Sequence, residues 1–235
     1  MNGLLTAVSQ AESVAANLAE TPVDCDVLIC PPATLIGVFA DKLKATAVKF
    51  GGQDCHWNEA GAHTGDISAE MLADLGCSYG IVGHSERRAD HGETDEIVKR
   101  KSLALLRAGV TPIICIGETQ GERESGSTLQ ILEGQLKGSV PADQDGAGLV
   151  VAYEPVWAIG TGLVPELSDI AEAHQHIRSV LKDMGILNAD EIRLLYGGSV
   201  KPGNAPEILA VDDVNGALVG GASLKAEDFL GIIRA

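Results

Sequence analysis

Glu154 and His84 are the residues of this sequence best suited by type and position to proton-transfer chemistry. Glu154 lies at the end of the apolar run Leu149–Pro155, and His84 ends the run Tyr79–His84. Ligands of parallel α/β proteins bind at the carboxyl ends of strands, so both side chains are predicted at one face. A carboxylate there can act as a general base, and a neutral histidine can donate a hydrogen bond to a developing oxyanion. The alternatives are a solvated loop-end glutamate and a structural histidine.

The residues around His84 are expected to differ in role. Ser85 is predicted to be the N-cap of the following helical turn, whose dipole would keep the imidazole of His84 neutral. Glu86 is ambiguous because it lies close to the same strand end. Arg87 and Arg88 are predicted to form structural ion pairs.

The segment after Glu154 has the composition of a loop that closes over a site. Pro155 stiffens one end, and Gly160 and Gly162 are predicted to act as a hinge at the other. Closure would exclude water and strengthen electrostatic interactions below the loop.

Two glycine pairs, Gly197-Gly198 and Gly220-Gly221, end the last two predicted strands. Glycine lets backbone N–H groups approach an anion, so these pairs are candidates for holding a phosphate. The alternative is ordinary turn glycines. The net charge of −16 argues against nucleic-acid and anionic-membrane partners, but not against such a backbone site.

The histidines outside this face are predicted not to bind metal. His174 and His176 are two residues apart on a predicted helix and therefore face different sides. His56, His63 and His91 lack cysteine or acidic partners at a spacing typical of metal ligands. Neither a metal nor a cofactor is expected.

Seven strand-like apolar runs alternate with eight helix-like runs to position these residues. The strand-like runs are Asp26–Cys30, Ala47–Gln53, Tyr79–His84, Thr111–Glu118, Leu149–Pro155, Ile192–Ser199 and Gly216–Ser223. They are continuous rather than alternating, which is typical of a parallel sheet buried on both faces. One domain over residues 1–235 is the simplest interpretation. A (β/α)8 barrel needs an eighth strand, and a doubly wound sheet remains open although no G-x-G-x-x-G motif follows an early strand.

The first helix-like run begins almost at the first residue. Its apolar stripe consists of Leu4, Val8, Ala11, Ala15 and Leu18.

The 235 residues include five cysteines without a CxxC pair, which indicates reduced thiols. With no signal peptide or apolar run of about 18 residues in view, a soluble, cytoplasmic protein is expected.

Four motifs resemble the triosephosphate isomerase family over nearly the whole chain. They are GHSERR (Gly83–Arg88), AYEPVWAIGTG (Ala152–Gly162), YGGSV (Tyr196–Val200) and GALVGGASL (Gly216–Leu224). The resemblance implies a glycolytic and gluconeogenic isomerase that interconverts dihydroxyacetone phosphate and glyceraldehyde 3-phosphate through an enediolate, without cofactor or metal.

The resemblance also implies roles for individual residues. Glu154 would be the base, His84 the neutral electrophile, and Glu86 a glutamate that the family keeps beside the histidine. The positions that resemble phosphate-binding residues are Gly160, Ser199, Gly220 and Gly221. Thr64 lies in the loop that reaches into the neighbouring subunit of a homodimer.

One departure from the family concerns the first residues. The family's first strand ends in a segment like G-N-W-K-M-N-G, and this chain begins at Met1-Asn2-Gly3. An incomplete TIM (β/α)8 barrel is therefore expected, with seven strands and eight helices, without the first-strand asparagine and lysine. A gap would leave two unpaired edges and a weakened or rearranged dimer. The lost positive charge predicts low or absent activity.

Three alternatives remain open at this stage. The first is a non-catalytic barrel that binds a phosphate ligand. The second is the product of a truncated gene, and the third is a different (β/α)8 isomerase.

Overall fold

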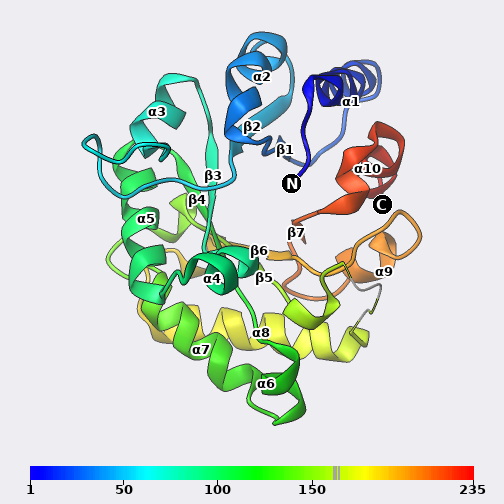
Figure 1. Ribbon diagram of the computed structural model, residues 1–235. Coiled ribbons are helices and arrows are strands. Elements are labelled where there is room, and N and C mark those ends of the chain that lie inside the picture. The colour runs from blue at the N-terminus through cyan, green and yellow to red at the C-terminus, as the bar shows by residue number, and fades with distance from the viewer. Residues whose placement is uncertain (161–162, 164) are drawn as a thin grey trace.

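Seven parallel strands form one curled sheet in the part of the chain that the computed structural model describes, residues 1–160, 163 and 165–235. The strands are β1 (Val27–Ile29), β2 (Val48–Gly52), β3 (Tyr79–Val82), β4 (Thr111–Ile116), β5 (Val150–Tyr153), β6 (Arg193–Tyr196) and β7 (Gly216–Ala217). Each pairs with its neighbour in sequence, so strand order follows chain order. Figure 1 shows the sheet curling inside a ring of helices. The seven expected strands are confirmed as a TIM-barrel-like α/β fold.

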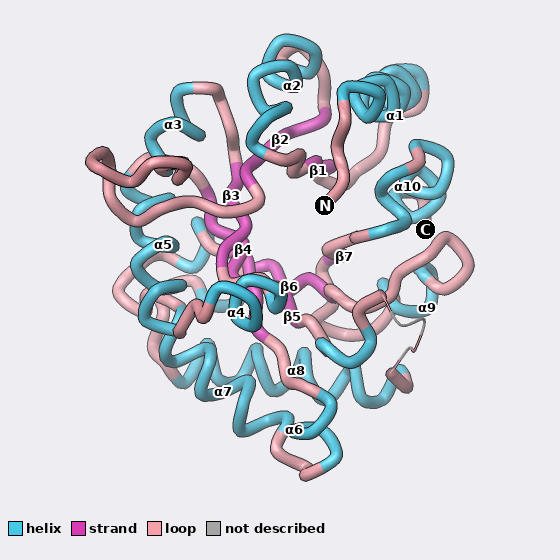
Figure 2. Tube along the Cα trace, in the orientation of Figure 1, coloured by secondary structure: helices cyan, strands magenta, loops and turns pink. Residues whose placement is uncertain are grey.

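Ten α-helices are described rather than the eight expected (Figure 2). They are α1 (Val8–Glu20), α2 (Ile36–Leu43), α3 (Ala69–Asp74), α4 (Ser85–His91), α5 (Asp95–Arg107), α6 (Gln120–Glu124), α7 (Thr128–Ser139), α8 (Leu167–Asp183), α9 (Ala205–Leu209) and α10 (Ala226–Ile233). The short helices α4 and α6 have no buried residue, so apolar periodicity does not reveal them. Side-chain caps start both, and α6 has a full capping box between Thr119 and Glu122.

The first helix differs from its predicted start. A 3-10 turn spans Leu5–Ala7, and α1 begins at Val8. The other four residues of the apolar stripe are buried, but Leu4 is 79% exposed. Leu4 precedes the regular helix, so the helical spacing does not carry it to the buried face.

Buried residues lie on both sides of the sheet. Alternate strand residues, such as Ile113 and Cys115 of β4, form a cluster inside the barrel. Their neighbours Ile114 and Ile116 join the larger cluster between strands and helices. Period-two alternation therefore places apolar side chains on both faces, which explains the continuous apolar runs.

An ion-pair cluster crosses the barrel at the amino ends of the strands. Asp26, directly before β1, accepts hydrogen bonds from Lys49 of β2 and Arg193 of β6, each at 2.9 Å. Arg193 also donates to the hydroxyl of Tyr79 at 3.0 Å. The cluster links β1 to strands across the barrel, while the described sheet ends at β1 and β7. No helix in the described residues is long and apolar enough to span a membrane.

Candidate functional site

The side chains of Glu154 and His84 meet at the carboxyl ends of β5 and β3, as predicted. Oε1 of Glu154 lies 2.8 Å from Nε2 of His84. Oε2 of Glu154 accepts the backbone N–H of Ser85 at 3.0 Å. The Glu154 side chain is 2% exposed and that of His84 26%, so the carboxylate is buried behind a partly accessible imidazole.

Close packing of the neighbouring strand ends fixes the backbone of Glu154. Its N–H donates to the carbonyl of Ile116 at 2.8 Å. A Cβ on Gly117 would overlap the carbonyl oxygen of Glu154, and one on Gly197 would lie 2.8 Å from its Cγ. A Cβ on Gly198 would overlap the hydroxyl of Tyr196. The pair Gly197-Gly198 therefore has a packing reason, independent of any anion.

His84 itself caps helix α4, which corrects the prediction that Ser85 does so. Its Nδ1 accepts the backbone N–H of Glu86 at 3.3 Å, while Ser85 is already the first helical residue. A ring whose Nδ1 accepts a hydrogen bond carries its proton on Nε2 when neutral. That proton points at Glu154.

Two opposing effects act on the protonation of His84. Burial lowers the pKa of His84, but the hydrogen bond and charge of Glu154 outweigh it, so the pKa lies above its ordinary value. The carboxylate of Glu86, 3.8 Å from Nδ1, acts in the same direction as Glu154. The contact with Glu154 therefore favours the protonated imidazole over the predicted neutral one. A ligand that separates the two side chains removes this effect.

The two arginines after Glu86 form ion pairs, as predicted. Arg88 contacts Asp95 at 2.6 Å, and Arg87 contacts Glu93 at 2.6 Å. These pairs fasten α4 to the start of α5 and leave Glu86 directed outward, with a side chain 78% exposed.

Glu118 points toward the loop after Glu154 instead of toward His84. Its Oε1 accepts the indole N–H of Trp157 at 2.9 Å and the hydroxyl of Tyr153 at 3.3 Å. Its carbonyl accepts the N–H of Val156 at 3.1 Å. Burial raises the pKa of Glu118. Glu118 is the last residue of the predicted run Thr111–Glu118, but the sequence did not reveal its contact with the loop, although a tryptophan three residues after Glu154 was a possible signal.

Gly160 has the backbone conformation expected at the far end of this loop. Its φ of 69° lies in the left-handed region that favours glycine. The 3-10 turn Val156–Ala158, which includes the Trp157 that contacts Glu118, precedes it. The other predicted hinge residue, Gly162, lies outside the described residues.

The four predicted phosphate-binding residues follow the neighbouring strands β5, β6 and β7. A Cβ on Gly160, Gly220 or Gly221 would meet no atom within 4 Å. The carbonyl of Ser199 accepts a hydrogen bond from Asn204 at 3.0 Å. Parallel neighbours end at the same edge of the sheet, so the four positions share an edge. Their role stays a prediction.

Thr64 lies apart from that edge. It belongs to the loop over residues 53–68, between β2 and α3, and is exposed. Figure 1 shows this loop in cyan, extending away from the barrel beside α3.

Comparison with known proteins gives one consistent result. The family model for triosephosphate isomerase matches residues 1–235. The triosephosphate isomerases of Bradyrhizobium diazoefficiens and Ruegeria pomeroyi are 56% and 58% identical, over 100% of this chain and 93% of theirs. A crystal structure of triosephosphate isomerase from Bartonella henselae superimposes with a TM-score of 0.92 at 44% identity, over 99% of this chain and 93% of that one.

These comparisons bear on the predicted defect. The prediction of low or absent activity is not borne out, since the chain spans 93% of the length of these relatives. The comparisons do not confirm that a first strand is missing, and this stays a prediction.

Proposed function

Because this chain belongs to the triosephosphate isomerase family, we propose that it interconverts dihydroxyacetone phosphate and glyceraldehyde 3-phosphate by proton transfer through an enediolate. The family is one of isomerase enzymes, and the full-length relatives support the activity. The observation that carries the mechanism is the contact between Glu154 and His84 at the strand ends.

In this mechanism Glu154 is the base that moves a proton between adjacent carbons of the substrate. The backbone N–H of Ser85 and the imidazole of His84 both contact its buried carboxylate and hold it at the carboxyl ends of the strands. His84 donates from Nε2 to the substrate oxygen on which negative charge develops. A substrate that inserts between the two side chains replaces their direct contact with two productive contacts.

Glu86 acts through His84 in this proposal. Its backbone N–H holds Nδ1 of His84, which directs the Nε2 proton toward the substrate. Its exposed carboxylate adds negative charge beside the ring. Glu86 is therefore a positioning residue.

The phosphate group is held by backbone N–H groups at Gly160, Ser199, Gly220 and Gly221. The open space beside the three glycines would admit a ligand close to the main chain. Backbone dipoles bind an anion without a cationic side chain, which suits a chain of net charge −16.

The chain is proposed to be a single barrel domain that forms a homodimer. The exposed loop that carries Thr64 extends from the barrel and would reach the neighbouring subunit.

A coupled isomerase assay tests the proposal. Glu154→Gln keeps the size of the side chain but removes the base, so kcat should fall by about 10²–10⁴. The matched control is Glu172→Gln, at an exposed position of α8, which should keep wild-type turnover. Wild-type turnover in Glu154→Gln overturns the assignment of the base. Binding of a triose phosphate analogue without turnover in the unaltered chain favours the non-catalytic alternative.

A further inference from the structure

The side chain of Gln135, on helix α7, binds both polar groups of the Gly117 backbone. The N–H of Gly117 donates to Oε1 of Gln135 at 2.7 Å, and Nε2 of Gln135 donates to the carbonyl of Gly117 at 3.1 Å. Gly117 directly follows β4, and Glu154 packs against it. We propose that Gln135 is a positioning residue, which holds the end of β4 so that Glu154 keeps its place at the strand ends. This role of Gln135 rests on the proposed function of Glu154 as the base.

Gln135 takes the place of a strand partner that is lacking at this point of the described sheet. The register between β3 and β4 runs as far as Val82 and Ile114. Continuing it would bring Ser85 opposite Gly117, but Ser85 is the first residue of α4. In a parallel ladder the N–H and the C=O of one residue face the same neighbour, so the turn into α4 leaves both groups of Gly117 to be paired elsewhere. A primary amide carries a donor and an acceptor side by side and satisfies both.

Two peptide groups transmit this restraint from the end of β4 to β5. The peptide group whose N–H belongs to Gly117 donates to Gln135, and its carbonyl accepts the N–H of Glu154 at 2.8 Å. The carbonyl of the next residue, Glu118, accepts the N–H of Val156 at 3.1 Å. Gln135 therefore orients the peptide groups that hold the backbone at Glu154 and two residues beyond it.

The backbone of Glu154 has little room to move independently of Gly117. A Cβ on Gly117 would overlap the carbonyl oxygen of Glu154, and one on Gly197 would lie 2.8 Å from its Cγ. Glu154 is therefore wedged between the ends of β4 and β6, and a shift of Gly117 displaces it. A misplacement of about 1 Å at a reacting group can lower the rate by about 10²-fold.

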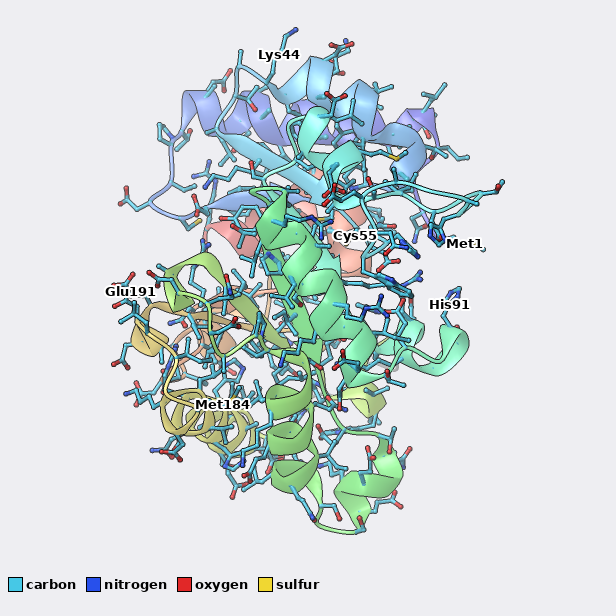
Figure 3. The ribbon with its side chains drawn as sticks, turned by 90° about the vertical axis from the view of Figure 1, so that its left-hand side faces the viewer. Met1, Lys44, Cys55, His91, Met184 and Glu191 are labelled. Carbon is cyan, nitrogen blue, oxygen red and sulfur yellow. The ribbon has the colours of Figure 1, made fainter. Side chains whose placement is uncertain are left out.

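Helix α7 is a rigid base for this contact. It packs against α5 and α8 outside the barrel, and Figure 3 shows it in green beside the yellow α8. One turn beyond Gln135, the hydroxyl of Ser139 accepts a hydrogen bond from Arg88 at 3.0 Å. The same nitrogen of Arg88 donates to the carbonyl of Cys115 at 3.1 Å. The helix therefore holds β4 at two points, Cys115 and Gly117.

Steady-state kinetics of Gln135→Met in the full chain test the proposal. Methionine keeps the length and helix propensity of glutamine but offers Gly117 no donor and only a weak acceptor. Because the displaced group is the base and not the phosphate site, kcat should fall by about 10–10² while KM changes less than about threefold. Gln130→Met, at an exposed position of the same helix, is the matched control and should keep wild-type kcat.

The titration of His84 separates positioning from a general loss of stability. Contact with Glu154 raises the pKa of His84, so a displaced Glu154 should lower the NMR midpoint of the His84 Cε1–H signal in Gln135→Met. Val14→Ala removes methyl groups from a buried position of α1, which packs on α2 and α10, and destabilises the fold away from the strand ends. This variant should keep both kcat and the His84 midpoint. All measurements are made below the unfolding transition of each variant.

Three results would overturn the role of Gln135. They are a kcat of Gln135→Met within about twofold of the unaltered chain, an equal loss of kcat in Gln130→Met or Val14→Ala, and an unchanged His84 midpoint in Gln135→Met. Absence of turnover in the unaltered chain would instead refute the proposed function, and the His84 midpoint would still decide whether Gln135 places Glu154.

Discussion

Nε2 of His84 lies 2.8 Å from Oε1 of Glu154, although the two residues follow strands that are not neighbours in the sheet. Strand β4 lies between β3 and β5, and a Cβ on Gly117, the residue after β4, would overlap the backbone carbonyl oxygen of Glu154. The proposed base and proton donor thus touch across a strand end, and this contact must open when a substrate enters.

Replacing His84 tests its proposed role as proton donor. His84→Leu removes both ring nitrogens and with them the Nε2 donor, and loss of one donor to a developing oxyanion lowers kcat by about 10²–10³. Steady-state kinetics should show a much smaller change in KM. His91→Leu serves as the matched exposed control. An unchanged kcat in His84→Leu would exclude His84 from the chemical step.

The contact with Glu154 should be visible in the titration of His84. In the free protein its pKa lies above 6.5, because Glu154 favours the charged imidazole. The resulting stability is fully present below pH 6.5 and is lost as pH rises through the raised pKa. NMR titration of the histidine Cε1–H signals should show a fall of this pKa in Glu154→Gln. A midpoint at or below 6.5 in the unaltered protein contradicts the coupling.

Trp157→Phe tests the anchoring of the loop on Glu118. The change leaves the buried Glu118 without its 2.9 Å indole donor, which should cost about 1–3 kcal/mol of unfolding free energy. A loosened loop base should also raise KM for the triose phosphate several-fold. Glu118→Gln keeps an acceptor and should have a milder effect. Urea denaturation and steady-state kinetics measure both effects, and an unchanged Trp157→Phe variant would refute the anchor.

His174 should make the fold sensitive to acid. It is fully buried, and burial lowers its pKa to about 4. The unfolded chain therefore takes up a proton near pH 6.5 that the folded chain refuses, so about 3 kcal/mol is lost as pH falls from 6.5 to 4.

The variant His174→Asn keeps a donor toward the carbonyl of Asp213, which lies 3.0 Å from Nδ1 in the unaltered chain. Urea unfolding should show a weaker decline in stability between pH 7 and 5 for this variant, while the exposed control His91→Asn should keep the original slope. Equal slopes in His174→Asn and the unaltered chain would contradict the assignment.

Two glycine substitutions should have opposite effects on stability. Gly117→Ala forces a Cβ onto the carbonyl of Glu154 and should cost several kcal/mol as well as activity. Gly134→Ala lies in the exposed interior of α7, where a Cβ meets no atom within 4 Å, and should stabilise by up to about 1 kcal/mol. Thermal unfolding measures both, and a tolerated Gly117→Ala would show that the strand ends can separate.

The sequence alone determined the strands and the face that carries Glu154 and His84. Continuous apolar runs bounded by glycine and proline mark buried parallel strands, and residues at the ends of such strands must share one edge. This reasoning follows from local pattern and chain order, so it needed no tertiary contact. The number of helices was underestimated because α4 and α6 depend on capping contacts and bury no residue.

The tertiary structure decided which groups touch. The position of a residue at a strand end does not specify the direction of its side chain. Glu118 accepts a hydrogen bond from Trp157, whereas Glu154 contacts His84. The protonation of His84 followed from that contact, because a pKa depends on distances of a few ångströms.

The structure also corrects the prediction that His56 and His63 lack an acidic partner, since one ligand atom from each and one from Asp66 all lie within 4.8 Å of one another. These three residues lie in an irregular loop, where no helical or strand period predicts which side chains converge.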